Sequence, residues 1–114
     1  MSRLAPAFPP DVAAALQQRS GTVTVRYTLA ARYADALPPF DLVLMRTEYE
    51  RVLASISLDT KRQLRFVRTG DPSEGARVAR TDATPLLESG SHPWQIALTW
   101  DPDQIAVEAH ASDA

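Results

Sequence analysis

Residues 92–110 constrain the fold more strongly than any other stretch, because large apolar side chains alternate with polar or small ones on both sides of a turn signal. In the first half, every second residue is large and apolar: Trp94, Ile96, Leu98 and Trp100. After Asp101-Pro102-Asp103 the alternation resumes over residues 105–110. A period of two around a proline turn predicts a β-hairpin. Both tryptophans fall on the same face of this hairpin, so we expect them to lie in the core.

Further stretches with the same alternation follow one another at intervals of about ten residues, which is typical of all-β proteins. The clearest is 22–30, in which one face holds Val23, Val25, Tyr27 and Leu29. The other expected strands are 40–45, 49–58, 63–69 and 76–80. We place 40–45 at the centre of a sheet because it is apolar on both faces, and we expect Val78 to point inward. Seven to eight short strands of this kind predict an antiparallel β-sandwich or barrel.

Two segments are expected to lie outside the sheets. Residues 1–10 contain three prolines among small residues and are expected to form a loose arm, followed by a short helix over 11–20 with Asp11 as its N-cap. A helix this short is not stable alone in water, so it must pack against the sheets. Residues 81–91 are expected to be irregular apart from a brief strand at Leu86 and Leu87.

Length and composition restrict the class of protein. At 114 residues the chain has the length of one domain, placed at 1–114. It contains no apolar run of about 18 residues, so we expect no membrane partner. The N-terminus lacks the continuous apolar region of a signal peptide, which makes the cytoplasm the default location. The absence of cysteine excludes disulfides, thiolate metal sites and a cysteine nucleophile.

Charge is unevenly distributed along the chain. Residues 61–80, the basic segment, carry six basic and two acidic side chains, whereas residues 81–114, the acidic segment, carry six acids and no lysine or arginine. One interpretation is a basic hairpin lying beside an acidic strand pair within one molecule. The other is a molecule with two charged surfaces that associates head to tail or binds a charged partner.

The residue inventory offers little for catalysis or metal binding. His92 and His110, the two histidines, lie at opposite ends of the predicted hairpin, and we expect both at the rim. Asp101 and Asp103 have the oxygen ligands that calcium prefers, but Asp-Pro-Asp is also a common turn, which is the interpretation we favour.

Two further patterns contain residue types that are used in catalysis. Ser89 and Ser91 lie just before His92 but lack the strained elbow that exposes a nucleophilic serine. Glu48 and Glu50 would share a strand face about 7 Å apart by strand rise, a separation that glycosidases use. The E-x-D-x-x-E pattern of sandwich glucanases is absent, however, and a solvated strand edge is the interpretation that we favour for these two glutamates. We therefore predict that the protein is not an enzyme, with no catalytic, cofactor-binding or metal-binding residues and no cofactor.

Nucleic-acid binding has one argument in its favour. Four arginines could form a basic strip, with Tyr27 or Tyr33 stacking on bases: Arg65, Arg68, Arg77 and Arg80. The isoelectric point of about 5.6 and the acidic segment argue against this function. We expect no nucleic-acid partner.

The hairpin carries a family resemblance. Residues 95–100, QIALTW, with His92 and Trp94 before them and 105–107 after them, resemble a hairpin of the concanavalin A-like lectin and glucanase superfamily, which includes laminin G-like domains. The upstream strand order is similar. The resemblance implies a jelly-roll-like β-sandwich. It carries over no sugar site, because residues 111–113 stand where the family has Asp-Gly and the chain contains no Asn.

These observations together predict a non-catalytic β-sandwich module that binds a protein partner or a second copy of itself. The basic segment and the acidic segment are the expected contact surfaces, and the expected partner-binding residues are Arg62, Arg65, Arg68, Arg77 and Arg80. The alternative is a carbohydrate-binding module of the concanavalin A-like type.

Overall fold

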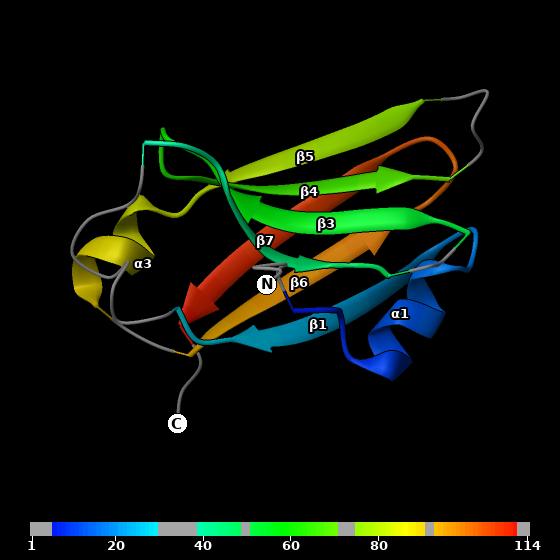
Figure 1. Ribbon diagram of the computed structural model, residues 1–114, viewed down its shortest axis with the longest axis horizontal. Helices are drawn as coiled ribbons and strands as arrows, with labels where there is room; N and C mark the ends of the chain where they lie inside the picture. Colours follow the sequence, from blue (N-terminus) through cyan, green and yellow to red (C-terminus); the bar gives the residue numbers. More distant parts are fainter. Residues whose placement is uncertain (1–5, 30–38, 49–50, 71–74, 91–92, 112–114) are drawn as a thin grey trace, which may run out of the picture.

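The computed structural model describes residues 6–29, 39–48, 51–70, 75–90 and 93–111, and within them the chain forms an antiparallel β-sandwich (Figure 1). Its seven strands divide between a four-stranded sheet in the order β2-β3-β4-β5 and a three-stranded sheet in the order β1-β6-β7. The predicted all-β sandwich of seven to eight strands with a short N-terminal helix is confirmed.

The four-stranded sheet is a meander in which each strand pairs with the next along the chain. It consists of β2 (Leu42–Arg46), β3 (Leu53–Leu58), β4 (Gln63–Thr69) and β5 (Ala76–Asp82). The expected bounds of 63–69 are confirmed, whereas β3 begins four residues later than expected. Asp59 makes the turn before β4, because its Oδ1 accepts hydrogen bonds from the backbone N–H groups of Lys61 and Gln63 at 2.8 and 3.0 Å.

The three-stranded sheet contains the predicted hairpin. Its strands are β1 (Gly21–Tyr27), β6 (Trp94–Trp100) and β7 (Ile105–Ala111). Asp101 holds the β6–β7 turn, since its Oδ1 accepts from the backbone N–H groups of Asp103 and Gln104 at 2.7 and 2.8 Å. Trp94 and Trp100 are each 1% exposed, so the expected burial of both indoles is confirmed.

The hydrophobic core lies between the two sheets and draws on the inner face of each. The fully buried aliphatic and aromatic side chains are Leu16, Val25, Leu44, Ile56, Leu58, Leu64, Phe66, Trp94, Ile96, Leu98 and Trp100. Along one side the sandwich is closed by packing of β5 against β7. Two short helices, α1 (Pro10–Leu16) and α3 (Thr84–Ser89), lie at opposite ends of the sandwich in Figure 1.

The N-terminal prediction is wrong for the described part of the arm. Residues 6–8 lie along β2, with the backbone N–H of Phe8 donating to Arg46 O at 3.0 Å and the N–H of Arg46 donating to Pro6 O at 3.1 Å. The side chain of Phe8 is buried, which explains why this proline-rich stretch packs on the sandwich. The helix expected over 11–20 spans Pro10–Leu16, and Asp11 lies in its first turn, not at the N-cap.

Two strand predictions need correction because of local geometry. Residues 40–45 were expected at a sheet centre, but β2 is the edge of its sheet and Phe40 is 61% exposed. An irregularity in the β2–β3 register places the consecutive residues Leu44 and Met45 in the core, which accounts for the loss of alternation. Val78 was expected to point inward, but it is 43% exposed, because the register with β4 places Ala79 opposite buried Phe66.

The expected irregular segment 81–91 contains regular structure. Strand β5 continues to Asp82, and α3 follows over Thr84–Ser89, where a brief strand was expected. Proline in the first turn and glycine after the last residue are the usual helix boundary signals. Gly90 adopts a φ of 67°, the left-handed conformation that ends a helix and favours glycine.

Candidate functional site

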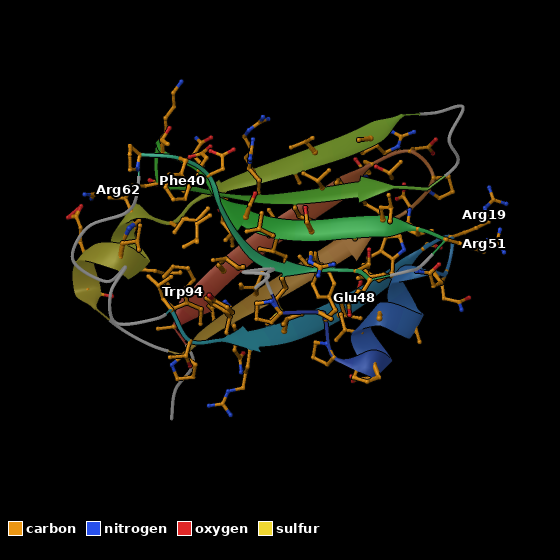
Figure 2. All side chains as sticks on the ribbon, viewed as in Figure 1. Arg19, Phe40, Glu48, Arg51, Arg62 and Trp94 are labelled. Atoms are coloured by element: carbon orange, nitrogen blue, oxygen red, sulfur yellow. The ribbon has the colours of Figure 1, made fainter. Side chains whose placement is uncertain are left out.

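A cleft of about 650 Å³ lies at the end of the sandwich where α1 ends, β3 and β5 begin, and the β6–β7 hairpin turns. Its charged lining residues, within the described part of the chain, are Arg19, Arg51, Arg68, Arg77 and Asp101. The neutral lining residues are Gln17, Val52, Gly70, Gly75 and Pro102. Figure 2 shows Arg19 and Arg51 at this end of the molecule, with Arg62 at the opposite end. Asp71 and Glu74, between the two glycines in sequence, lie outside the described residues.

Arg68 is anchored in the cleft by backbone oxygens at the end of α1. Its Nε and Nη2 donate to Leu16 O at 3.3 and 3.0 Å, and Nη2 also donates to Gln18 O at 2.7 Å. The last carbonyls of a helix lack intrahelical partners and carry partial negative charge, so a cation is favourable there. Desolvation lowers the pKa of Arg68, but a guanidinium remains protonated in proteins. The carbonyl contacts therefore orient Arg68 without neutralising its charge.

The ring of Trp100 lies against the guanidinium group of Arg68. The guanidinium carbon of Arg68 lies 5.6 Å from the centroid of the Trp100 ring, within the range of a cation–π contact. The Nε1 of Trp100 donates at 2.9 Å to the same Gln18 oxygen that accepts from Arg68. The ring lies against Gly21, where a Cβ atom would come within 2.8 Å of the Trp100 Cζ2. The absence of a side chain at Gly21 thus permits the position of Trp100 and, through it, of Arg68.

Arg77 is the cross-strand neighbour of Arg68 on the inner face of the four-stranded sheet. The β4–β5 register places the two residues directly opposite each other. Arg77 Nη1 donates to Asp103 O at 2.7 Å, which connects β5 to the β6–β7 turn. Among the described residues, neither arginine forms an ion pair with a carboxylate. Like charges directly opposite each other in a sheet repel, and no described carboxylate offsets the repulsion within this pair.

Arg19 and Arg51 form the exposed rim of the cleft. The side-chain amide of Gln17 pairs with the backbone of Val52, donating to Val52 O at 3.3 Å and accepting from Val52 N–H at 3.1 Å. This two-bond contact joins the end of α1 to the start of β3, so the nearby residues Arg19 and Arg51 line the same cleft. Neither side chain has a polar partner among the described residues.

The five predicted partner-binding arginines do not share one surface. Arg68 and Arg77 lie in the cleft, whereas Arg65 and Arg80 are opposite each other on the outer face of the sheet. Arg65 forms an ion pair with Asp41 and donates through Nε to Ser57 Oγ at 3.4 Å. The exposed Arg62 occupies the β3–β4 turn with a φ of 63°.

The expected single basic surface is therefore incorrect, and its failure has a simple cause. Residues 65 and 68 are separated by an odd number of positions, so strand alternation alone places them on opposite faces. That signal was available in the sequence. Arg19 and Arg51 were missed because their proximity depends on the docking of α1 beside β3, which no local pattern indicates.

The other candidate residues are not assembled into a site in the described part of the chain. His110 is exposed on β7, while His92, Ser91 and Glu50 lie outside the described residues. Glu48 forms an ion pair with Arg46 at 3.0 Å. Within the described ranges, no group of three or more His, Cys, Asp or Glu side chains could hold a metal ion.

The comparisons found no matching family model, no matching curated protein and no matching solved structure. The concanavalin A-like resemblance of the hairpin therefore stays a prediction. Neither α1 nor α3, the helices of the described residues, has the length and apolar character needed to cross a membrane. Fold and site together define an antiparallel β-sandwich with an arginine-lined cleft at one end.

Proposed function

We propose that the protein is a non-catalytic interaction module that binds an acidic segment of a partner protein, or of a second copy of itself, in the arginine-lined cleft. The observation that carries this proposal is the placement of four arginines around one cleft, against a single carboxylate among its described lining residues. Arginine is over-represented where proteins recognise carboxylate or phosphate, because its planar fork donates two parallel hydrogen bonds.

The cleft is also preorganised for an anion. Arg68 and Arg77 are held by backbone carbonyl oxygens of Leu16, Gln18 and Asp103, which fix the direction of each guanidinium. Less side-chain entropy is lost on binding when the contacting groups are already fixed. The rim residues Arg19 and Arg51 are exposed and add long-range attraction for an acidic partner.

A second copy of the chain carries carboxylates that suit this cleft. The acidic segment contains no lysine or arginine, and several of its acids are exposed: Asp82, Glu88, Asp103 and Glu108. Carbohydrate binding, the alternative function, gains no specific support, because both tryptophans are buried and present no ring face to a ligand.

The test is the binding of a fluorescent glutamate-rich peptide to the wild-type protein and to two double charge reversals. Arg19→Glu with Arg51→Glu alters the rim of the cleft. Arg62→Glu with Arg80→Glu makes the same change in net charge away from it and is the matched control. All four side chains are exposed, so we expect both variants to fold.

We expect the wild-type protein and the control variant to bind the peptide, with an affinity that falls as added salt shortens the Debye length. The rim variant should bind at least about tenfold more weakly, since hydrogen bonds to charged groups contribute roughly 1.5–3 kcal/mol each. Equal losses in both double variants, or no binding by the wild-type protein, would refute the proposal. Size-exclusion chromatography identifies the source of the acidic segment: a dimer that dissociates in salt indicates a second copy, and a constant monomer indicates a separate partner.

A further inference from the structure

We infer that the floor of the cleft is a binding site for a phosphate group, held between Arg68 and Arg77 and approached past Arg19 and Arg51. This inference rests on the proposed function, since it names the chemical group that the same cleft takes. The phosphate has two possible sources, a small phosphorylated compound or a phosphorylated side chain of a partner protein.

The first argument is the position of Arg68 and Arg77 in the sheet. Residues directly opposite each other in an antiparallel pair have Cβ atoms about 4.5–5.5 Å apart. The two side chains start from this short separation and line the same cleft. One bound anion that accepts hydrogen bonds from both guanidinium groups converts their repulsion into a bridge. The anion therefore restores stability that the unliganded fold lacks.

The second argument is the set of donors that each guanidinium keeps for a ligand. Arg68 uses Nε and Nη2 on carbonyl oxygens, so its Nη1 makes no hydrogen bond to a described residue. Arg68 and Gly70, which lies beside this Nη1, both line the cleft. Arg77 uses Nη1 on Asp103 O, which leaves its Nε and Nη2 edge without a described partner.

The third argument is charge and geometry, and it favours phosphate over a carboxylate. A carboxylate has two oxygens and a single negative charge. A phosphate monoester has three terminal oxygens and a charge of about −1.5 to −2, so it can accept from several guanidinium groups at once. The described lining has four cations and one carboxylate, an excess that a dianion offsets more completely than a single carboxylate does.

The experiment is thermal unfolding of the full chain in inorganic phosphate and in chloride at matched ionic strength. We expect phosphate to raise the melting temperature of the wild-type protein saturably, by about 5 °C at ten times its dissociation constant. The intrinsic fluorescence should change along the same titration, because the Trp100 ring lies beneath Arg68.

Variants locate the site. Arg77→Gln should weaken the phosphate affinity roughly tenfold, the effect of losing one charged hydrogen bond. Arg51→Gln, which removes a charge at the rim, should weaken it less than Arg77→Gln does. Arg80→Gln removes the same charge from the same strand as Arg77 but from the outer face, and it should keep the wild-type response. Arg68 also holds α1, so it is not used as the probe. The inference is overturned if phosphate stabilises the wild-type protein no more than chloride, or if Arg77→Gln responds like the wild type.

Two matched peptides separate this inference from the proposed function and identify the source of the phosphate. One carries a single phosphoserine, and the other has glutamate at that position. Tighter binding of the phosphoserine peptide than of inorganic phosphate supports a phosphorylated partner protein, whereas equal binding supports a small phosphorylated compound. If the glutamate-rich peptide binds and neither form of phosphate does, the phosphate site is refuted and the proposed function stands. If inorganic phosphate binds and no peptide does, the proposed function is refuted and the phosphate site stands.

Discussion

Strands β4 and β5 carry two pairs of arginines in which the partners are directly opposite each other, and the two pairs have different surroundings. Arg65 and Arg80 are opposite on the outer face, and Arg68 and Arg77 are opposite on the inner face at the cleft. Arg65 has a carboxylate partner in Asp41. Within the described residues, the hydrogen-bond and ring partners of the cleft pair are carbonyl oxygens and the Trp100 ring. The outer pair is thus partly neutralised, whereas the cleft pair is oriented but keeps its full charge.

This difference distinguishes an outer pair that costs the fold little from a cleft pair whose charge is available to a ligand. An exposed ion pair contributes only about 0–1 kcal/mol, so the outer pair is close to neutral for the fold. Two oriented cations with no carboxylate partner among the described residues repel each other, and natural proteins retain such conflicts mainly at functional sites. The sequence alone, in which all four arginines belong to one basic segment, does not show this distinction.

The largest expected effect comes from removing Trp100, whose ring lies beneath Arg68 of the cleft pair. Trp100→Ala deletes a buried indole and its hydrogen bond to Gln18, and we expect a loss of about 3–5 kcal/mol in the free energy of unfolding. Denaturant titration followed by circular dichroism measures it. Phe40→Ala, at an exposed ring, is the control and should cost less than about 0.5 kcal/mol. A loss below about 1 kcal/mol for Trp100→Ala would contradict the stabilising role that we assign to Trp100.

The next effect compares one arginine from each pair directly. Arg68→Met keeps the aliphatic stem but removes the donor to Leu16 O and leaves Gln18 O with only the Trp100 Nε1 donor, and we expect a loss of about 2 kcal/mol. Arg65→Met breaks an exposed ion pair and should cost less than about 1 kcal/mol. The same denaturant titration applies. Equal losses would show that the two faces are not treated differently.

A steric change sharpens the comparison without altering any charge. Gly21→Ala places a Cβ atom within 2.8 Å of the Trp100 ring and forces the ring to shift. We expect a loss of about 1–3 kcal/mol, as for other overpacked sites, together with weaker stacking of Arg68. Gly70→Ala, where the nearest contact would be an ordinary 3.5 Å, serves as the control. A changed fluorescence spectrum for the first variant only is the expected result.

The smallest expected effect is the pH dependence of the stability that Asp82, a carboxylate on the outer face, contributes. Two hydrogen bonds from Thr84 lower the pKa of Asp82, and the one from the backbone has the larger effect than the one from the side chain. Asp82 shares the outer face of the sheet with Arg80. A lowered folded-state pKa means that Asp82 stabilises the fold above the ordinary value of 3.8, and that this contribution is lost as the pH falls through the folded pKa. Asp82→Asn should therefore be less stable than the wild type near neutral pH and equal to it in acid. A constant difference at every pH would contradict this assignment.

The sequence is sufficient for the hairpin and the sandwich, because both depend on local alternation and turn chemistry. The β6–β7 hairpin with its two buried tryptophans follows from a period of two around Asp101-Pro102-Asp103. The side of β5 that faces the core does not follow in this way. Val78 is larger than Ala79, but the register with β4 places Ala79 opposite buried Phe66, so Val78 lies on the outer face. The edge position of β2 was missed because a register irregularity mimics the apolar pattern of a central strand.

The candidate site depends on contacts that are distant in sequence, and this limits prediction. Gln17 and Val52 are 35 positions apart, and Arg68 and Leu16 are 52 positions apart. No local pattern indicates these pairings, so the approach of Arg19 to Arg51 could not be expected. The separation of Arg65 from Arg68 is different, because the alternation of a strand already contains it.

The central claim is that the cleft pair keeps a charge that the outer pair has partly neutralised, and the salt dependence of two single variants tests it most directly. The melting temperatures of Arg77→Gln and Arg80→Gln are compared with the wild type in chloride, from about 0.1 M to about 1 M, where the Debye length falls from about 10 to about 3 Å. We predict that Arg77→Gln loses stability through the missing hydrogen bond to Asp103 O, and that this loss is smaller at low salt than at high salt, because relief of repulsion with Arg68 offsets part of it only at low salt. Arg80→Gln should change little at either concentration. Destabilisation by Arg77→Gln at low salt that fades at high salt would show that Arg77 already has an acidic partner, and would contradict the account.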